Sequence, residues 1–142
     1  MSRHGYIDGL EVEDQLAFGR WRAQVNSAMR GRRGQAFLKE LADEMDAMPV
    51  KELIAGELVS EGGECCAIGV VCKSRGVDVA KLDYEDWNAV GESVDIAGQM
   101  AAEIEYENDD CGPYGRRETP AERWTRMRKW VEKKLKSGAH HA

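Results

Sequence analysis

The chain has 142 residues, 42% of them hydrophobic and 32% charged, with a formal net charge of −6 at pH 7. A chain of this length commonly forms one domain with its own core and needs no disulfide or metal for stability. No apolar run approaches the roughly 20 residues that cross a bilayer, and acidic residues interrupt the N-terminal stretch where a signal peptide would be apolar. We therefore expect a soluble, cytoplasmic protein without a membrane partner.

Charge is distributed unevenly along the chain. Residues 1–37 carry a net charge of +2, residues 38–110 a net charge of −14 and residues 111–142 a net charge of +6. Two interpretations remain open at this point. The acidic and basic parts either pair with each other inside the fold or form separate external binding faces.

Two helices are predicted in the first third of the chain. Apolar residues recur every three to four positions over residues 13–30 and again over residues 35–48, where Pro49 marks the end of the second helix. Because a short glycine-containing loop joins them, the two helices should pack antiparallel.

The middle of the chain has a different pattern. Two short apolar runs flank a glycine pair at residues 62–63, which predicts a hairpin with strands at 55–60 and 63–67. The apolar run that follows could be a strand or a helix, and Gly76 in the position of a C-cap glycine favours a helix.

Three capping signals predict the remaining helices. Asp83 and Asp95 are candidate N-caps for two of them. Thr119, Pro120 and Glu122 form a capping box with proline at the first helical position, and this predicts a final helix that ends near residue 136.

The predicted fold is mainly α (α+β), with five or six helices and a small two-stranded β-hairpin near residues 55–67. It divides into an N-terminal arm (residues 1–12), a single helical domain (residues 13–136) and a C-terminal tail (residues 137–142). The arm could cross onto a second copy of the chain, which would make a homo-oligomer.

Residues with reactive side chains form no recognisable catalytic pattern. The cysteines Cys65, Cys66, Cys72 and Cys111 lack the close spacing of zinc ligands, and every histidine lies near a terminus. Without a histidine nearby, a cysteine or serine nucleophile has no general base, and no glycine-rich phosphate loop is present. We expect buried, reduced thiols and a non-enzymatic protein without a metal or cofactor.

Charged clusters are the better candidates for function. An acidic surface could mimic the backbone of a nucleic acid and so bind a basic protein. Arginines next to tryptophans could instead bind a nucleic acid directly. The candidate acidic interaction face consists of Glu85, Asp86, Glu103, Glu107, Asp109 and Asp110. The candidate basic interaction face consists of Arg20, Arg30, Arg32, Arg33, Arg123, Arg126, Lys129 and Trp130.

Five segments carry a resemblance to other proteins: RGRRGQAFLKEL (30–41), DAMP (46–49), ECCAIGVVC (64–72), IAGQMAAEIEYENDD (96–110) and ETPAERWTRMRKWVEKKL (118–135). In this order the chain resembles small proteins that phages and prophages of Gram-negative bacteria encode, a group without an established activity. The resemblance implies a host-directed interaction protein in the bacterial cytoplasm, such as an inhibitor of CRISPR or of another defence system, with a host or defence-system protein as its partner. The alternatives are a nucleic-acid-binding protein and a binder of a nucleotide signal.

Overall fold

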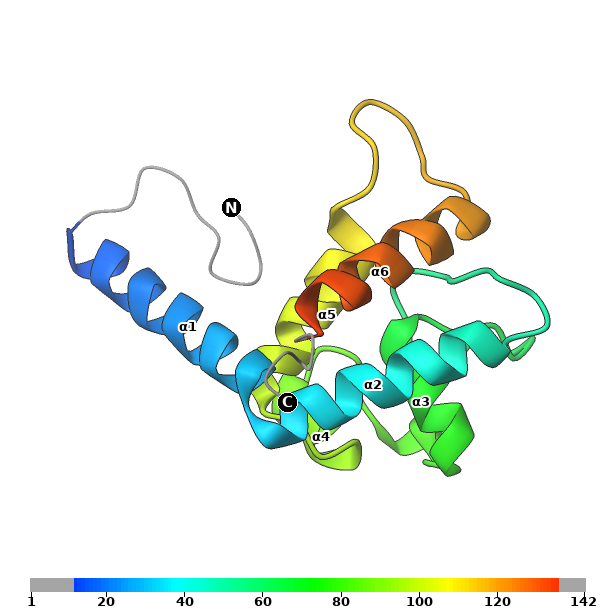
Figure 1. The fold of residues 1–142 in the computed structure, drawn as a ribbon, viewed down its shortest axis with the longest axis horizontal. Coiled ribbons are helices and arrows are strands. Elements are labelled where there is room, and N and C mark those ends of the chain that lie inside the picture. The colour runs from blue at the N-terminus through cyan, green and yellow to red at the C-terminus, as the bar shows by residue number, and fades with distance from the viewer. Residues whose placement is uncertain (1–11, 136–142) are drawn as a thin grey trace.

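Helices make up most of the chain that the structure describes. The computed structural model describes residues 12–135. Its elements in chain order are α1 (Val12–Arg30), α2 (Arg32–Ala47), α3 (Ala67–Arg75), the 3-10 helix η1 (Val79–Lys81), α4 (Trp87–Ser93), α5 (Gly98–Asp110) and α6 (Pro120–Lys134), as Figure 1 shows. The predicted helical fold is confirmed for these residues. Except for Val12, the predicted N-terminal arm lies outside the described residues, as does the C-terminal tail.

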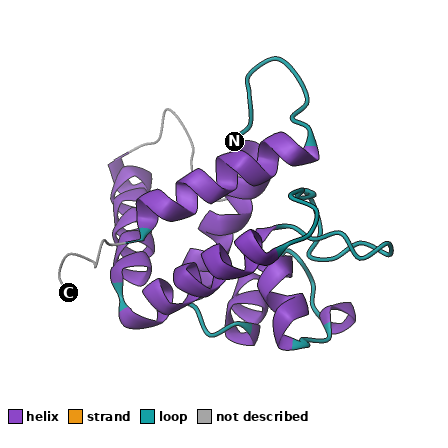
Figure 2. Ribbon diagram, turned by 45° about the vertical axis from the view of Figure 1, so that its right-hand side comes forward, coloured by secondary structure: helices purple, strands orange, loops and turns teal. Residues whose placement is uncertain are grey.

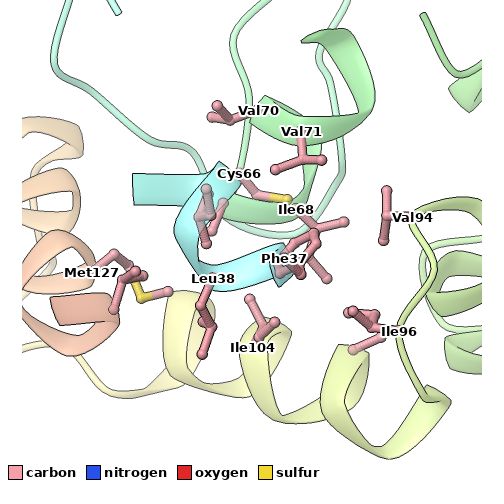
Figure 3. Packing of buried hydrophobic residues seen from close by; sticks show 14 of the residues in the cluster. Phe37, Leu38, Cys66, Ile68, Val70, Val71, Val94, Ile96, Ile104 and Met127 are labelled. Carbon is pink, nitrogen blue, oxygen red and sulfur yellow. The ribbon is translucent and has the colours of Figure 1, made fainter. Parts of the chain in front are cut away.

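The core forms around α2. Phe37 and Leu38 of α2 are at most 1% exposed, and Figure 3 shows them between Ile68 of α3, Ile104 of α5 and Met127 of α6. Burying an apolar side chain of this size contributes about 1.5–3 kcal/mol. Helix α2 packs against α1, α3 and α6, and α5 packs against α1, α3, α4 and α6.

The joint between α1 and α2 corrects one prediction. The helices do not pack antiparallel but diverge at a wide angle from Gly31, as Figures 1 and 2 both show. The Gly31 amide donates to Ser27 O (3.0 Å) and Gly31 O accepts from the Gln35 amide (2.9 Å), so helical hydrogen bonding continues through the joint. A single residue is too short to reverse the chain, since antiparallel helix pairs need a loop of about two to five residues.

Gly34 makes this joint possible. A Cβ atom at Gly34 would lie 2.0 Å from Ala28 O and 3.1 Å from Met100 Sδ. Only glycine lets the first turn of α2 approach α1 and α5 this closely.

The predicted β-hairpin near residues 55–67 is wrong. Among the described residues no strand forms, and the segment is a loop in Figure 2. The two apolar runs form one isolated antiparallel bridge, between Val59 and Cys65. Because α3 begins at Ala67, directly after this bridge, the second run has no length left to extend a ladder.

The ambiguous run after the bridge is a helix, as predicted. Gly76 ends α3 with a φ of +73°, and its amide donates to the Lys73 carbonyl (3.2 Å). This left-handed conformation suits glycine because it has no Cβ atom. The first six residues of α3 are all buried, so α3 runs through the core.

Two predicted N-caps are wrong. Asp86, not Asp83, caps α4 by accepting a hydrogen bond from the Ala89 amide (3.2 Å), while Asp83 stabilises the preceding turn. Helix α5 begins after Ala97 without a side-chain cap, and Asp95 has a φ of +61° in the turn between α4 and α5. Several aspartates can fill one role in this region, so the capping signal alone does not locate the helix start.

The capping box of α6 is confirmed. Thr119 Oγ1 accepts from the Glu122 amide (3.1 Å), and Glu122 Oε1 accepts from the Thr119 amide (2.9 Å). These reciprocal bonds satisfy two amides at the helix start and fix where α6 leaves the preceding loop.

Candidate interaction surfaces

Two arginines of α6 hold the C-terminal end of α5. Arg126 Nη1 donates to Glu107 O (2.7 Å) and Arg126 Nη2 to Asn108 O (3.1 Å), while Arg123 Nε donates to Asn108 O (3.0 Å). Carbonyls at a helix C-terminus lack helical partners and carry partial negative charge, so cations stabilise them. We call Arg123 and Arg126 the arginine clamp.

The arginine clamp also neutralises a buried acid. Glu118 is 8% exposed, and its carboxylate lies 2.7 Å from Arg126 Nε and 3.4 Å from Arg123 Nε. Arg126 further contacts the carboxylate of Glu107 at 3.2 Å. These two members of the predicted basic face therefore form internal contacts.

A second pair ties α1 to α5. Arg22 Nη1 and Nη2 donate to the two carboxylate oxygens of Glu103 at 2.7 and 3.3 Å. Burial and the nearby Glu107 carboxylate raise the pKa of Glu103 and Lys134 lowers it, with a net rise to about 7. The Glu103 side chain thus keeps a proton to higher pH than an exposed glutamate does.

The structure divides the predicted acidic face. Glu103 and Glu107 face arginines of α1 and α6, and Asp109 accepts from the hydroxyl of Tyr84 (2.7 Å) and from the amide of Gly56 (3.3 Å). The exposed members are Glu85, Asp86 and Asp110. The six residues therefore do not form one continuous surface.

The predicted basic face is divided in the same way. Besides the arginine clamp, Trp130 is half-buried, with Lys134 Nζ 5.9 Å from its ring centroid. Arg33 forms an exposed ion pair with Asp95 (3.1 Å). The remaining members are exposed: Arg20, Arg30, Arg32 and Lys129.

A group of exposed acids that includes Glu85 and Asp86 of the predicted face lies on residues 78–95, which we call the acidic segment. This segment spans η1 and α4 and contains six acids and one lysine, a net charge of −5. All six acids are exposed: Asp78, Asp83, Glu85, Asp86, Glu92 and Asp95. Four of them, Asp78, Asp83, Glu92 and Asp95, are absent from the predicted face. Counting charge in short windows would have found them.

The cysteines are free thiols. Cys65, Cys66 and Cys72 are buried and Cys111 is half-buried, as expected for cysteines that pack as small apolar residues. Burial raises the pKa of all four thiols, to about 12 for Cys111. At neutral pH they are protonated and therefore weak nucleophiles and weak metal ligands.

A basic cavity lies at the joint of α1 and α2. It has a volume of about 440 Å³, and Arg32, Arg33, Gln24 and Gln99 line it. Gly31 is the N-cap of α2 and gives no side-chain cap to the amides of the first turn. Because α1 ends one residue before α2 begins, the opposed ends of the two helix dipoles meet here, and the positive charge of the cavity comes from the two arginines.

One loop projects from the helices. Residues 111–119 connect α5 to α6 and extend away from the body in Figure 1. Tyr114 in this loop is fully exposed. Arg116 donates two hydrogen bonds of 2.9 Å to Glu122, which lower the pKa of that carboxyl to about 2. The loop is thus anchored to the first turn of α6 at ordinary pH.

Compared with known proteins, the chain matches no family model, no curated sequence and no solved structure. None of the described helices is both long and apolar enough to cross a membrane. Within residues 12–135, no group of three or more histidine, cysteine, aspartate or glutamate side chains is arranged to hold a metal ion.

Proposed function

We propose that the protein is a non-enzymatic interaction protein of phage or prophage origin, which binds a basic surface on a host protein through the acidic segment. The observation that carries this proposal is the distribution of the acids. Glu103 and Glu107 of α5 face arginines of α1 and α6, whereas the six acids of the acidic segment face solvent.

A concentrated negative surface favours one kind of partner. Complementary charge accelerates encounter with a basic surface and disfavours acidic proteins and nucleic acids. Since the acidic segment holds a net charge of −5 in 18 residues, it dominates the field around α4. A nucleic-acid-binding protein of the host, including one of a defence system such as CRISPR, has the required basic surface.

A pull-down from host lysate with two matched triple variants tests this proposal. Asp83→Asn, Glu85→Gln and Glu92→Gln together remove three charges from the acidic segment. Glu52→Gln, Glu57→Gln and Glu61→Gln together remove the same number from exposed positions elsewhere. We expect a specific partner to be retained by the wild type and the second variant and lost by the first. Equal retention by both variants, or no partner above background, contradicts the proposal.

A second candidate function is supported by the cavity at the joint of α1 and α2. There, Arg32 and Arg33 line one cavity, and two arginines together suit a phosphate group. The ligand would be a nucleotide signal or the backbone of a nucleic acid. Asp95, paired with Arg33, places negative charge beside this cavity, and for that reason we rank this function second.

Two measurements test the second function. A nucleotide that binds only the folded chain raises its melting temperature, and a nucleic acid gives a gel shift that weakens with salt. Both effects should disappear in Arg32→Ala/Arg33→Ala and persist in Arg20→Ala, a change to another exposed arginine. Absence of both effects at low salt excludes this function.

A further inference from the structure

A cavity opens at the acidic segment, next to two tryptophans that contact each other. Trp21 of α1 and Trp87 of α4 have ring centroids 6.3 Å apart and an interplanar angle of 59°. Both side chains line a cavity of about 330 Å³, together with the acidic-segment residues Glu85 and Asp86. The cavity therefore combines two aromatic walls with two carboxylates.

Tight backbone packing fixes the walls of this cavity. A Cβ atom on Gly98, the first residue of α5, would lie 3.2 Å from Asn88 Cα, so the backbone of α4 at Asn88 lies close against α5. At the other end of α4, the amides of Val94 and Ile96 both donate to Gly91 O, at 3.1 and 2.9 Å. Helix α4, and with it Trp87, is held firmly against α5.

The chemistry of the walls selects a cation. The face of an indole ring attracts positive charge through its quadrupole, and a desolvated site strengthens that attraction. Glu85 and Asp86 add full negative charges, and Asp86 uses one carboxylate oxygen, Oδ1, to cap α4. A carboxylate has two oxygens with several lone pairs and can accept further hydrogen bonds. An anion would be repelled, and a neutral apolar group would leave the carboxylates without a partner.

Among cations, guanidinium fits this arrangement better than ammonium. It is planar, stacks on aromatic rings and presents several N–H donors to carboxylates. We propose that the cavity beside the Trp21–Trp87 pair binds an arginine side chain of the partner protein. This inference rests on the proposed function for the source of the arginine, but the cavity itself can be tested with a small molecule.

The test is a titration of the full chain with N-acetyl-arginine amide, followed in ¹H–¹⁵N NMR spectra through the four indole N–H signals. We expect the signals of Trp21 and Trp87 to move with a Kd on the order of 1–10 mM, as suits one side chain bound by cation–π contact and charge. Trp124 and Trp130 do not line this cavity, and their signals are the internal control. N-acetyl-citrulline amide, which has nearly the same shape without the charge, should bind at least about tenfold more weakly.

The test also needs variants that preserve the fold. Glu85→Gln/Asp86→Asn preserves the cap of α4, because asparagine caps as well as aspartate does, and should weaken binding by about fivefold or more. No shift of the Trp21 and Trp87 signals, equal shifts of all four signals, or equal binding of the citrulline probe overturns the inference. Binding by a chain that starts at residue 12 but not by the full chain also overturns it, because the cavity would then be assigned to the first eleven residues. If the pull-down partner depends on the acidic segment while the arginine probe fails, the proposed function survives and the cavity inference does not.

Discussion

Helix α5 and the acidic segment are both rich in acidic residues, but these residues have different structural roles in the two regions. On α5, Glu103 lies 2.7 Å from Arg22, which is 81 positions away in sequence. Glu107 lies 3.2 Å from Arg126, which is 19 positions away. In the acidic segment the acids are exposed, and Asp83 and Asp86 bond to nearby amides of their own turn. Composition alone therefore does not separate acids that hold a fold together from acids that present a surface. Separation depends on which helix packs against them.

The largest expected effect concerns the α5 side of this comparison. Arg126→Ala removes the guanidinium that contacts Glu118 and Glu107 and leaves the Glu118 carboxylate buried without that partner. Breaking a buried ion pair from one side costs about 3 kcal/mol or more of unfolding free energy. Urea denaturation measures this loss. Lys129→Ala, an exposed change on the same helix, should cost less than about 0.5 kcal/mol. Equal effects of the two changes would show that the arginine clamp is not structural.

A smaller effect is expected from the titration of Glu103. Its pKa rises from an ordinary 4.5 to about 7 in the folded chain, so between these values the folded chain holds a proton that the unfolded chain releases. Stability should therefore fall as pH rises from about 4.5 through about 7, by about 1 kcal/mol after allowance for partial solvent screening. In Glu103→Gln this part of the pH dependence should vanish. Denaturation curves at several pH values measure both chains, and identical pH profiles would contradict the raised pKa.

The smallest expected effect on stability comes from changes in the acidic segment. Glu85→Gln/Glu92→Gln alters two exposed acids and should change the unfolding free energy by less than about 0.5 kcal/mol. The reduced repulsion among neighbouring acids makes a slight stabilisation the expected sign. A loss of more than 1 kcal/mol would mean that these acids support the fold, and the comparison with α5 would then fail.

Local signals in the sequence predicted the elements that depend on a few neighbouring residues. The capping box at Thr119 and the C-cap at Gly76 were read correctly, because each is complete within a few positions. Where several neighbouring residues could cap a helix, the prediction is wrong. Asp83 and Asp95 are the predicted N-caps, whereas the structure has Asp86 as the N-cap of α4 and Ala97 as the N-cap of α5. The sequence offered no local way to choose among them.

Long-range pairing was the part that the sequence could not supply. The predicted charged faces mixed residues such as Arg126 and Glu107, which contact each other across 19 positions, with residues such as Arg20 and Glu85, which are exposed. The cavity beside the Trp21–Trp87 pair is not predicted from the sequence for the same reason, since these two residues lie 66 positions apart in the chain. Each tryptophan fitted an apolar helical face, and nothing near either one indicated the other.

The arginine clamp also has a consequence for motion in the native state. For α6 to open by itself, Glu118 would have to lose its cations while still enclosed, and two carbonyls of α5 would lose their donors. Such an opening is costly, so α6 and the last turn of α5 should exchange their amide hydrogens together, as one slow cooperative unit. The first turns of α1 differ, because the side chains of residues 13–17 are all exposed. Amide protection should therefore rise steeply along α1 towards the Gly31 joint, and the fold should open least readily where the acidic helix α5 meets the basic helix α6.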